Sequence, residues 1–320
     1  MTSPASAALP IRRLTPGDLP ACLELAEDRG WEPEDHKWRL LLTAGRGYGV
    51  DAPDRPGGLI GTYVLTSYSG GGGVHGGGVH GGAYGCLSMV LVAGRCARQG
   101  LGRRLVRHAL DESGPAATFL AATEEGRPLY EQLGFKSVAH TTVLRGTFTG
   151  ELPPSPPSAP SPPRAPARVR GATAADLRGV IALDSEAFGA DRTELLARLP
   201  AFADRFVVAE RTGGSGGSDG TGTGRVLTGF AACWPSPSAT VIGPVVAEDL
   251  STAQALITEL GTRTTGPVRY DADSRHGALE EWLHGNGLAE DLVFSLMTHT
   301  APDLPGDLGR RFAPYSVALG

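Results

Sequence analysis

The stretch "RCARQGLGRRLVRHAL", Arg95 to Leu110, decides the fold of the first half of the chain. It follows the unbroken apolar run "CLSMVLV" (Cys86–Val92), which is typical of a central strand buried on both faces. Leu101, Leu105 and Ala109 then recur at helical spacing. The stretch therefore predicts a strand, a glycine loop and a helix. Its two glycines would let a ligand approach the backbone, and the amides of the first helical turn would face an anion.

Several ligands fit a glycine loop at such a junction. A dinucleotide loop needs a third glycine, but Leu105 stands in its place, and a P-loop needs Gly-Lys-Ser/Thr, which does not follow. A turn without any ligand would crowd four arginines, at positions 95, 98, 103 and 104, at the positive end of a helix. That crowding is mildly destabilising unless an anion is bound. The residues favour an anion site and leave its ligand open.

The composition is that of a soluble protein with two domains. The chain has 320 residues and a net charge of −5, which favours neither nucleic acid nor an anionic membrane surface as a partner. Neither an export signal nor a run long enough to span a membrane is evident. The four cysteines form no CxxC pair, so we expect reduced thiols in the cytoplasm: Cys22, Cys86, Cys96 and Cys233.

Three low-complexity segments punctuate the chain. Proline-rich "ELPPSPPSAPSPPRAPA", residues 151–167, predicts an extended linker between domains at 1–150 and 168–320. The segment Gly70–Gly82 repeats GGGVH, and His75 with His80 suggests a metal site. Ordering so flexible a chain would cost much entropy, and no carboxylate or thiolate completes the ligand set. We expect an expanded loop there and no metal, and we interpret Gly213–Gly224 in the same way.

The two halves resemble each other. "IRRLTPGDLPACLELAE" from Ile11 aligns with "VRGATAADLRGVIALDS" from Val169, so that Thr15 and Asp18 fall on Thr173 and Asp176 at one offset. Each Thr-x-x-Asp predicts a variant capping box at the start of a helix. In both halves a strand pair, a strand, a helix, a strand and a final helix follow. The sequence predicts a duplicated α+β unit around a mixed sheet flanked by helices.

The first half resembles the GNAT superfamily of acyl-CoA-dependent N-acetyltransferases. The residues that carry this resemblance are "ARQGLGRRL" after a buried strand ending in valine, and "EEGRPLYEQLGFKSV" further on. The resemblance covers residues 11–148, and the second half fits the same fold less closely. It implies the GNAT fold, acetyl-CoA as cosubstrate, and direct transfer of the acetyl group to a primary amine.

The resemblance also implies the residues of the coenzyme site. The pyrophosphate would lie on the amides of Arg98, Gln99, Gly100, Leu101, Gly102 and Arg103, the pantetheine arm would pair with Val90, Leu91 and Val92, and Thr123 stands where many members have an asparagine. Ala97 departs from the family pattern, which has arginine or glutamine there. Because most contacts come from backbone amides, we expect binding to survive this change.

Tyr130 holds the place of the family's general acid, beside Leu-Gly-Phe. A phenol there could donate a proton to the departing thiolate. The general base is not identifiable, since surface or capping roles explain each candidate equally well: Glu34, Asp35, Glu124 and Glu125. "GWEPEDHKW", Gly30–Trp38, could line the acceptor site, and its tryptophans could equally pack in the core.

The second half lacks these features. "EDLSTAQA" replaces the glycine loop, and Leu283 stands opposite Tyr130, so we expect a degenerate copy. The leading hypothesis is an N-acetyltransferase that acts on an unidentified amine of a small molecule or a peptide. The alternative is an acyl-CoA-binding sensor without turnover. A homodimer is left open.

Overall fold

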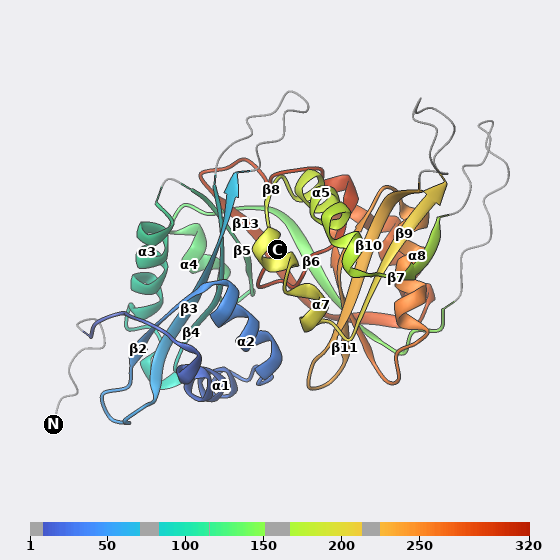
Figure 1. The fold of residues 1–320 in the computed structure, drawn as a ribbon. Helices are drawn as coiled ribbons and strands as arrows, with labels where there is room; N and C mark the ends of the chain where they lie inside the picture. Colours follow the sequence, from blue (N-terminus) through green and yellow to red (C-terminus); the bar gives the residue numbers. More distant parts are fainter. Residues whose placement is uncertain (1–8, 71–82, 115, 151–166, 213–224) are drawn as a thin grey trace. The chain divides into compact units, whose positions relative to one another are not determined.

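The computed structural model describes residues 9–70, 83–114, 116–150, 167–212 and 225–320 (Figure 1). The repeat with His75 and His80, the linker up to residue 166 and the segment 213–224 lie outside the described residues, so the expectations for them stay predictions. The chain forms two compact units. Unit 1 contains Met1–Thr141, Val293–Leu304 and Val317–Gly320, and unit 2 contains Thr142–Leu292 and Pro305–Ser316.

Unit 1 is a mixed sheet covered by helices on both faces. Its strands lie in the order β1-β2-β3-β4-β5-β13. The elements of its main segment are β1 (Arg12–Arg13), α1 (Leu19–Asp28), α2 (Asp35–Ala44), β2 (Arg46–Asp51), β3 (Leu59–Gly70), β4 (Tyr84–Val92), α3 (Leu101–Ser113), β5 (Ala117–Ala122), α4 (Arg127–Glu131) and β6 (Lys136–Gly146), which ends in unit 2.

The two faces of this sheet are distinct. A Cβ built on Gly85 would lie 2.9 Å from the hydroxyl of Ser113, so this residue of β4 faces α3. A Cβ built on Gly45, just after α2, would lie 2.7 Å from the Thr66 hydroxyl and 2.9 Å from Val64, so these residues of β3 face α2. Successive residues of a strand alternate between faces. We call the two sides of the sheet the α3 face and the α2 face.

Unit 2 repeats this arrangement. Its strands lie in the order β12-β11-β10-β9-β7, and β14 pairs with β11. The elements of the second half are β7 (Arg168–Gly171), α5 (Leu177–Phe188), β8 (Ala190–Asp191), α6 (Thr193–Leu196), α7 (Leu199–Phe202), β9 (Arg205–Thr212), β10 (Arg225–Pro235), β11 (Thr240–Ala247), α8 (Leu250–Gly261), β12 (Val268–Asp273), α9 (Gly277–Gly285), β13 (Leu288–His299), which ends in unit 1, and β14 (Arg311–Ala313).

The duplicated capping boxes form as the sequence predicts. The Thr15 amide donates to Asp18 at 2.8 Å, and the Thr173 amide donates to Asp176 at 2.8 Å. In each unit an arginine on the preceding strand also binds the capping aspartate. Arg12 binds Asp18 at 2.7 Å, and Arg170 binds Asp176 at 2.8 Å. The same side chains therefore start the first helix of each unit. Within the described part of the chain, no helix is long and apolar enough to cross a membrane.

Candidate functional site

The edge of β4 separates from β5 halfway along the strand. The two strands pair in parallel from Tyr84 opposite Ala117 to Cys86 opposite Phe119, and among the described residues the register goes no further. A β-bulge follows, because Thr62 pairs with Leu91 while Val64 pairs with Ser88. A bulge bends its strand and commonly ends pairing. The second half of β4 therefore leaves an unpaired backbone edge on the side of β5.

The bulge is centred on Met89, which takes a left-handed conformation with φ 51°. The hydroxyl of Thr62 donates to the Met89 carbonyl at 3.0 Å and holds the bulge in place. Because one extra residue shifts the alternation, Val92 faces α3, where its side chain lies 3.7 Å from a Cβ built on Gly102. The backbone of Val90 to Val92, which the sequence assigns to the pantetheine arm, belongs to this displaced part of β4.

The loop after β4 ends at an uncapped helix. Gly100 is the N-cap of α3, with φ 83°, and no side chain of the described residues caps the first turn. A Cβ built on Gly100 has no atom of the described part of the chain within 4 Å, so this glycine borders open space there. One built on Gly102 would lie 3.3 Å from Leu129 of α4, so this glycine permits close packing of two helices. Free amides at a helix N-terminus bind anions. The start of α3 therefore suits a phosphate group.

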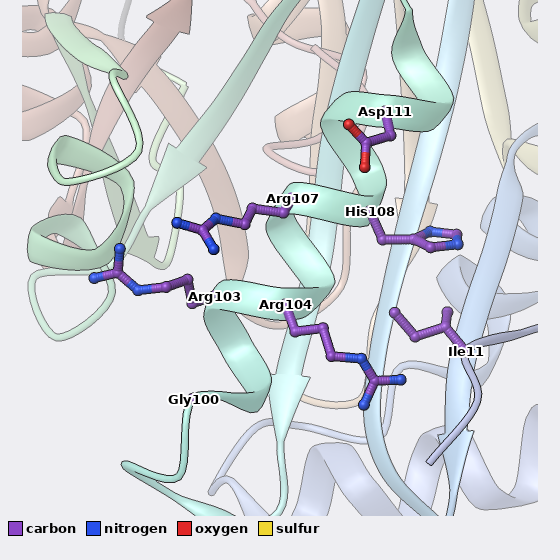
Figure 2. A pocket seen from close by; sticks show the side chains of 7 residues that line it. All are labelled: Ile11, Gly100, Arg103, Arg104, Arg107, His108 and Asp111. Atoms are coloured by element: carbon purple, nitrogen blue, oxygen red, sulfur yellow. The ribbon is translucent and has the colours of Figure 1, made fainter. Parts of the chain in front are cut away.

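The arginines around this start point in different directions. Arg103 and Arg107 extend to one side of α3, and Arg104 extends to the other side with His108 (Figure 2). Arg103 binds the side chain of Gln132, and Arg104 binds the carbonyl of Leu9. An open groove of about 510 Å³ runs along the helix α3. It is lined by Ile11 and by six residues of the helix and its N-cap: Gly100, Arg103, Arg104, Arg107, His108 and Asp111. Arg103 and Arg104 are thus held by groups of the protein, but neither of these two partners carries a negative charge.

Two further arginines flank the loop itself. Arg95 binds Asp54 at 3.1 Å, whereas Arg98 is exposed and left-handed, with φ 60°. The Gly94 amide donates to Asp28 at 2.7 Å, which fixes the beginning of the loop to α1. Gln99 donates to the Arg95 carbonyl at 3.1 Å. The loop is therefore tied at its beginning and exposed from Ala97 to Gly100.

Tyr130 lies in α4, which packs beside the start of α3. Its side chain is 8% exposed. The centroid of its ring lies 5.8 Å from that of the Phe135 ring, in an edge-to-face arrangement. Burial raises the pKa of the Tyr130 phenol well above its ordinary value, so the group is protonated at neutral pH. A Cβ built on Gly126 would lie 3.3 Å from this ring and 3.2 Å from the Thr123 hydroxyl. Thr123 itself accepts the Gly126 amide at 3.2 Å, so its hydroxyl helps to start α4.

The candidate bases and aromatic residues are largely engaged in structure. Glu34 binds Lys37 in a buried ion pair, and Asp35 binds Arg39 at 2.7 Å. Glu124 is exposed, and Glu125, also exposed, lies 3.4 Å from Arg29. The two tryptophans separate: Trp38 is fully buried in the core, and Trp31 is 37% exposed.

His299 lies beside the turn that follows α4. The ring of His299 lies 5.1 Å from that of Phe135, and its Nε2 atom lies 3.5 Å from a Cβ built on Gly134. His299 reaches unit 1 because β13 pairs antiparallel with β5, with His299 opposite Thr118. No sequence motif surrounds it, and the long-range strand pairing brings it beside Phe135.

Unit 2 fills the equivalent edge with its own chain. β11 and β12 pair in parallel from Thr240 opposite Val268 to Ile242 opposite Tyr270, as β4 and β5 do. Beyond that point, β14 pairs antiparallel with β11 at Val245 and Val246. The phenol of Tyr270 on β12 also donates to Phe312 of β14 at 2.9 Å. A strand of the protein therefore occupies the edge that is unpaired in unit 1.

The helix that follows β11 is capped by acids. Asp249 accepts the Thr252 amide at 2.8 Å, and Arg211 binds Asp249 at 2.7 Å and Glu248 at 2.8 Å. Leu283, which stands opposite Tyr130, is fully buried in the core of unit 2. These contacts take the place of the open helix start and the phenol that unit 1 provides.

A mixed sheet with a splayed strand, a glycine loop and an open helix start defines an acyltransferase-type architecture. Two family models, both described as "Acetyltransferase (GNAT) domain", match the chain. One matches residues 180–313 and the other matches residues 76–148. The uncharacterized N-acetyltransferase YitH of Bacillus subtilis (strain 168) is 27% identical over 235 residues, which cover 73% of this chain and 76% of that protein. The chain belongs to the GNAT superfamily and contains two GNAT-like domains.

Solved structures share the whole fold. A putative acetyltransferase from Pyrococcus horikoshii has a TM-score of 0.71 and 14% identity, covering 100% of this chain and 98% of its own. A GCN5-related N-acetyltransferase from Sphaerobacter thermophilus has a TM-score of 0.55 and 19% identity, covering 95% and 98%. A tandem GNAT protein from the clavulanic acid biosynthesis pathway has a TM-score of 0.55 and 14% identity, covering 92% and 99%. The predicted fold class is confirmed.

Proposed function

We propose that this protein is an acetyl-CoA-dependent N-acetyltransferase whose single acyl-CoA site lies in unit 1. One observation carries the proposal: the unpaired edge of β4 leads directly to the uncapped start of α3. The amides from Arg98 to Arg103 would hold the pyrophosphate, and the backbone of Val90 to Val92 would pair with the amides of the pantetheine arm. Acetyl-CoA would supply the activated acyl group.

Unit 2 supports this use of the strand edge. In unit 2 the equivalent edge is paired with β14, an extended segment with alternating amide and carbonyl groups. A pantetheine arm presents the same kinds of group in an extended chain, so the unpaired edge of β4 suits it. In unit 2 the same ligand would meet β14 and the carboxylates of Glu248 and Asp249. We therefore assign one acyl-CoA to each chain.

Tyr130 would assist the departure of the thiol. In direct transfer, the nitrogen of a neutral primary amine attacks the thioester carbon, and the bond between that carbon and sulfur breaks. The Tyr130 phenol donates its hydrogen bond, and then its proton, to the sulfur as negative charge develops. The proton that the nitrogen loses passes to water, from which Tyr130 recovers its own. Burial keeps the phenol protonated before each turnover.

A second candidate function is an acyl-CoA-binding sensor without turnover. Two features favour it: Ala97 stands at the first position of the loop pattern, and the Thr123 hydroxyl is already bonded to the Gly126 amide. Tyr130 favours catalysis, because its phenol could donate a proton to the departing thiolate.

Two measurements test the proposal. Isothermal calorimetry with coenzyme A measures binding, and release of free thiol from acetyl-CoA across a panel of primary amines measures transfer. Acetyltransfer predicts binding together with amine-dependent thiol release. Binding with no release for any amine would support the sensor, and no binding would refute both functions.

A further inference from the structure

Two buried hydroxyl groups on the α2 face of unit 1 have no hydrogen-bond partner among the described residues. Ser88 on β4 is 8% exposed and Thr66 on β3 is 2% exposed. Ser88 pairs with Val64, and Thr66 pairs with Cys86 on the same two strands. The hydroxyls are thus diagonal neighbours on one face. Leaving a buried hydroxyl unpaired is costly, and native proteins usually satisfy such groups.

The pair lies next to the reaction centre of the proposed function. Ser88 immediately precedes the bulge at Met89, and it stands two residues before Val90. An arm that pairs with β4 from Val92 back to Val90 therefore points its acyl end toward Ser88, about 7 Å further along the strand. The acceptor nitrogen must reach that acyl end. Ser88 lies on the α2 face at this point of β4, so an acceptor bound along the α2 face would bring its nitrogen to that acyl end.

The far end of this surface is closed by the C-terminal segment Val317–Gly320, which belongs to unit 1. The Tyr68 phenol donates to the Leu319 carbonyl at 2.5 Å, and the Cys86 thiol donates to the Ala318 carbonyl at 3.4 Å. Ala318 and Leu319 are buried. The phenol of Tyr68 and the thiol of Cys86 are thereby satisfied by the segment. Among the described residues, the hydroxyls of Thr66, which stands opposite Cys86, and of Ser88, which is nearer the bulge, have no such partner.

We propose that Ser88 and Thr66 form a subsite that binds an uncharged hydroxyl or amide group of the amine acceptor, close to its reactive nitrogen. The inference rests on the proposed acetyltransfer. Hydroxyl groups both donate and accept, so the pair suits a hydroxyl or amide. A carboxylate or a second ammonium would need a charged partner in so buried a place, and the pair offers none. The acceptor class is therefore an amino alcohol or an amino amide.

A matched pair of amines tests the subsite. 2-Amino-1-phenylethanol carries a hydroxyl beside its aminomethyl group, and 2-phenylethylamine lacks it. We expect the wild-type protein to favour the first by about 5- to 100-fold in kcat/KM, the range that one buried hydrogen bond spans. Where another amine is the better substrate, the same ratio is measured from the two compounds as competitive inhibitors. Ser88→Ala should abolish most of the preference, and Thr66→Val should reduce it, with the KM for acetyl-CoA unchanged.

Thr118→Val is the matched control. Thr118 is equally buried, but its hydroxyl lies on the α3 face, where it is bonded to Ser113 at 3.1 Å. This variant should keep the wild-type preference, and thermal melting checks that all three variants fold. Equal use of the two amines by the wild type, or a preference that survives Ser88→Ala in folded protein, would overturn the subsite and leave acetyltransfer intact. Absence of transfer to every amine would overturn both.

Discussion

Replacing Gly100 with alanine separates the coenzyme role of the α3 start from its structural role. Gly100 has φ 83° and ψ −2°, a left-handed conformation that costs a residue with a Cβ about 1–2 kcal/mol. The added methyl would project away from the described residues, none of which has an atom within 4 Å of it. A bound pyrophosphate would occupy that space. We therefore expect a loss of about 1–2 kcal/mol in the free energy of unfolding and a fall of at least ~10-fold in affinity for coenzyme A, which is about 1.4 kcal/mol.

Gly114, at the other end of the same helix, is the matched control. It has φ 62° and ψ −134°, and no atom that the structure describes lies within 4 Å of a Cβ built on it. Gly114→Ala should cost about 1–3 kcal/mol of stability and leave coenzyme A binding unchanged. Urea unfolding measures the stability, and calorimetry on folded protein measures the affinity. Equal affinities of the Gly100→Ala variant and the wild type would refute the placement of the pyrophosphate.

The other predictions concern catalysis and stability. Tyr130→Phe should lower turnover by about 10²- to 10⁴-fold with little change in coenzyme affinity; wild-type turnover would remove the phenol from the mechanism. Leu283→Ala should destabilise unit 2 by about 2–5 kcal/mol, because Leu283 is fully buried, and should cause no selective loss of turnover in folded protein. Hydrogen bonding to Arg12 holds the pKa of Asp18 below its ordinary value. The ionised Asp18 therefore stabilises the folded state fully above about pH 4, the pKa of an aspartate in the unfolded chain, and this stabilisation is lost as the pH falls through the lower pKa of the folded state. Asp18→Asn should therefore cost about 1 kcal/mol at pH 7 and progressively less below pH 4 in urea melts, and a gap that stays constant at pH 2 would contradict this account.

The local elements of the fold could be predicted because neighbouring residues encode them. Thr15 and Asp18 form the capping box through contacts that span only a few residues, and the same contacts recur at Thr173 and Asp176. The apolar spacing of α3 likewise places Leu101 and Leu105 in the core. Gly100 follows the same logic, since a left-handed N-cap at a strand-to-helix junction favours glycine.

The long-range features could not be predicted, because backbone pairing sets them. β13 completes unit 1 by pairing with β5, and β14 closes the open edge of β11. Neither strand carries a side-chain pattern that indicates the strand with which it pairs. The bulge at Met89 and the left-handed Arg98 occur at residues for which such a conformation is uncommon. The site that these features create, an open edge in one unit and a filled edge in the other, appears only once the strands are paired.

The stoichiometry of coenzyme A binding tests the central claim most directly. The wild-type chain and the Gly100→Ala variant are titrated by calorimetry under the same conditions. The open edge of β4 and the filled edge of β11 predict one coenzyme A per chain, with the affinity of that one site reduced in the variant. Two sites per chain, or one site whose affinity Gly100→Ala leaves unchanged, would contradict the assignment of the acyl-CoA site to unit 1.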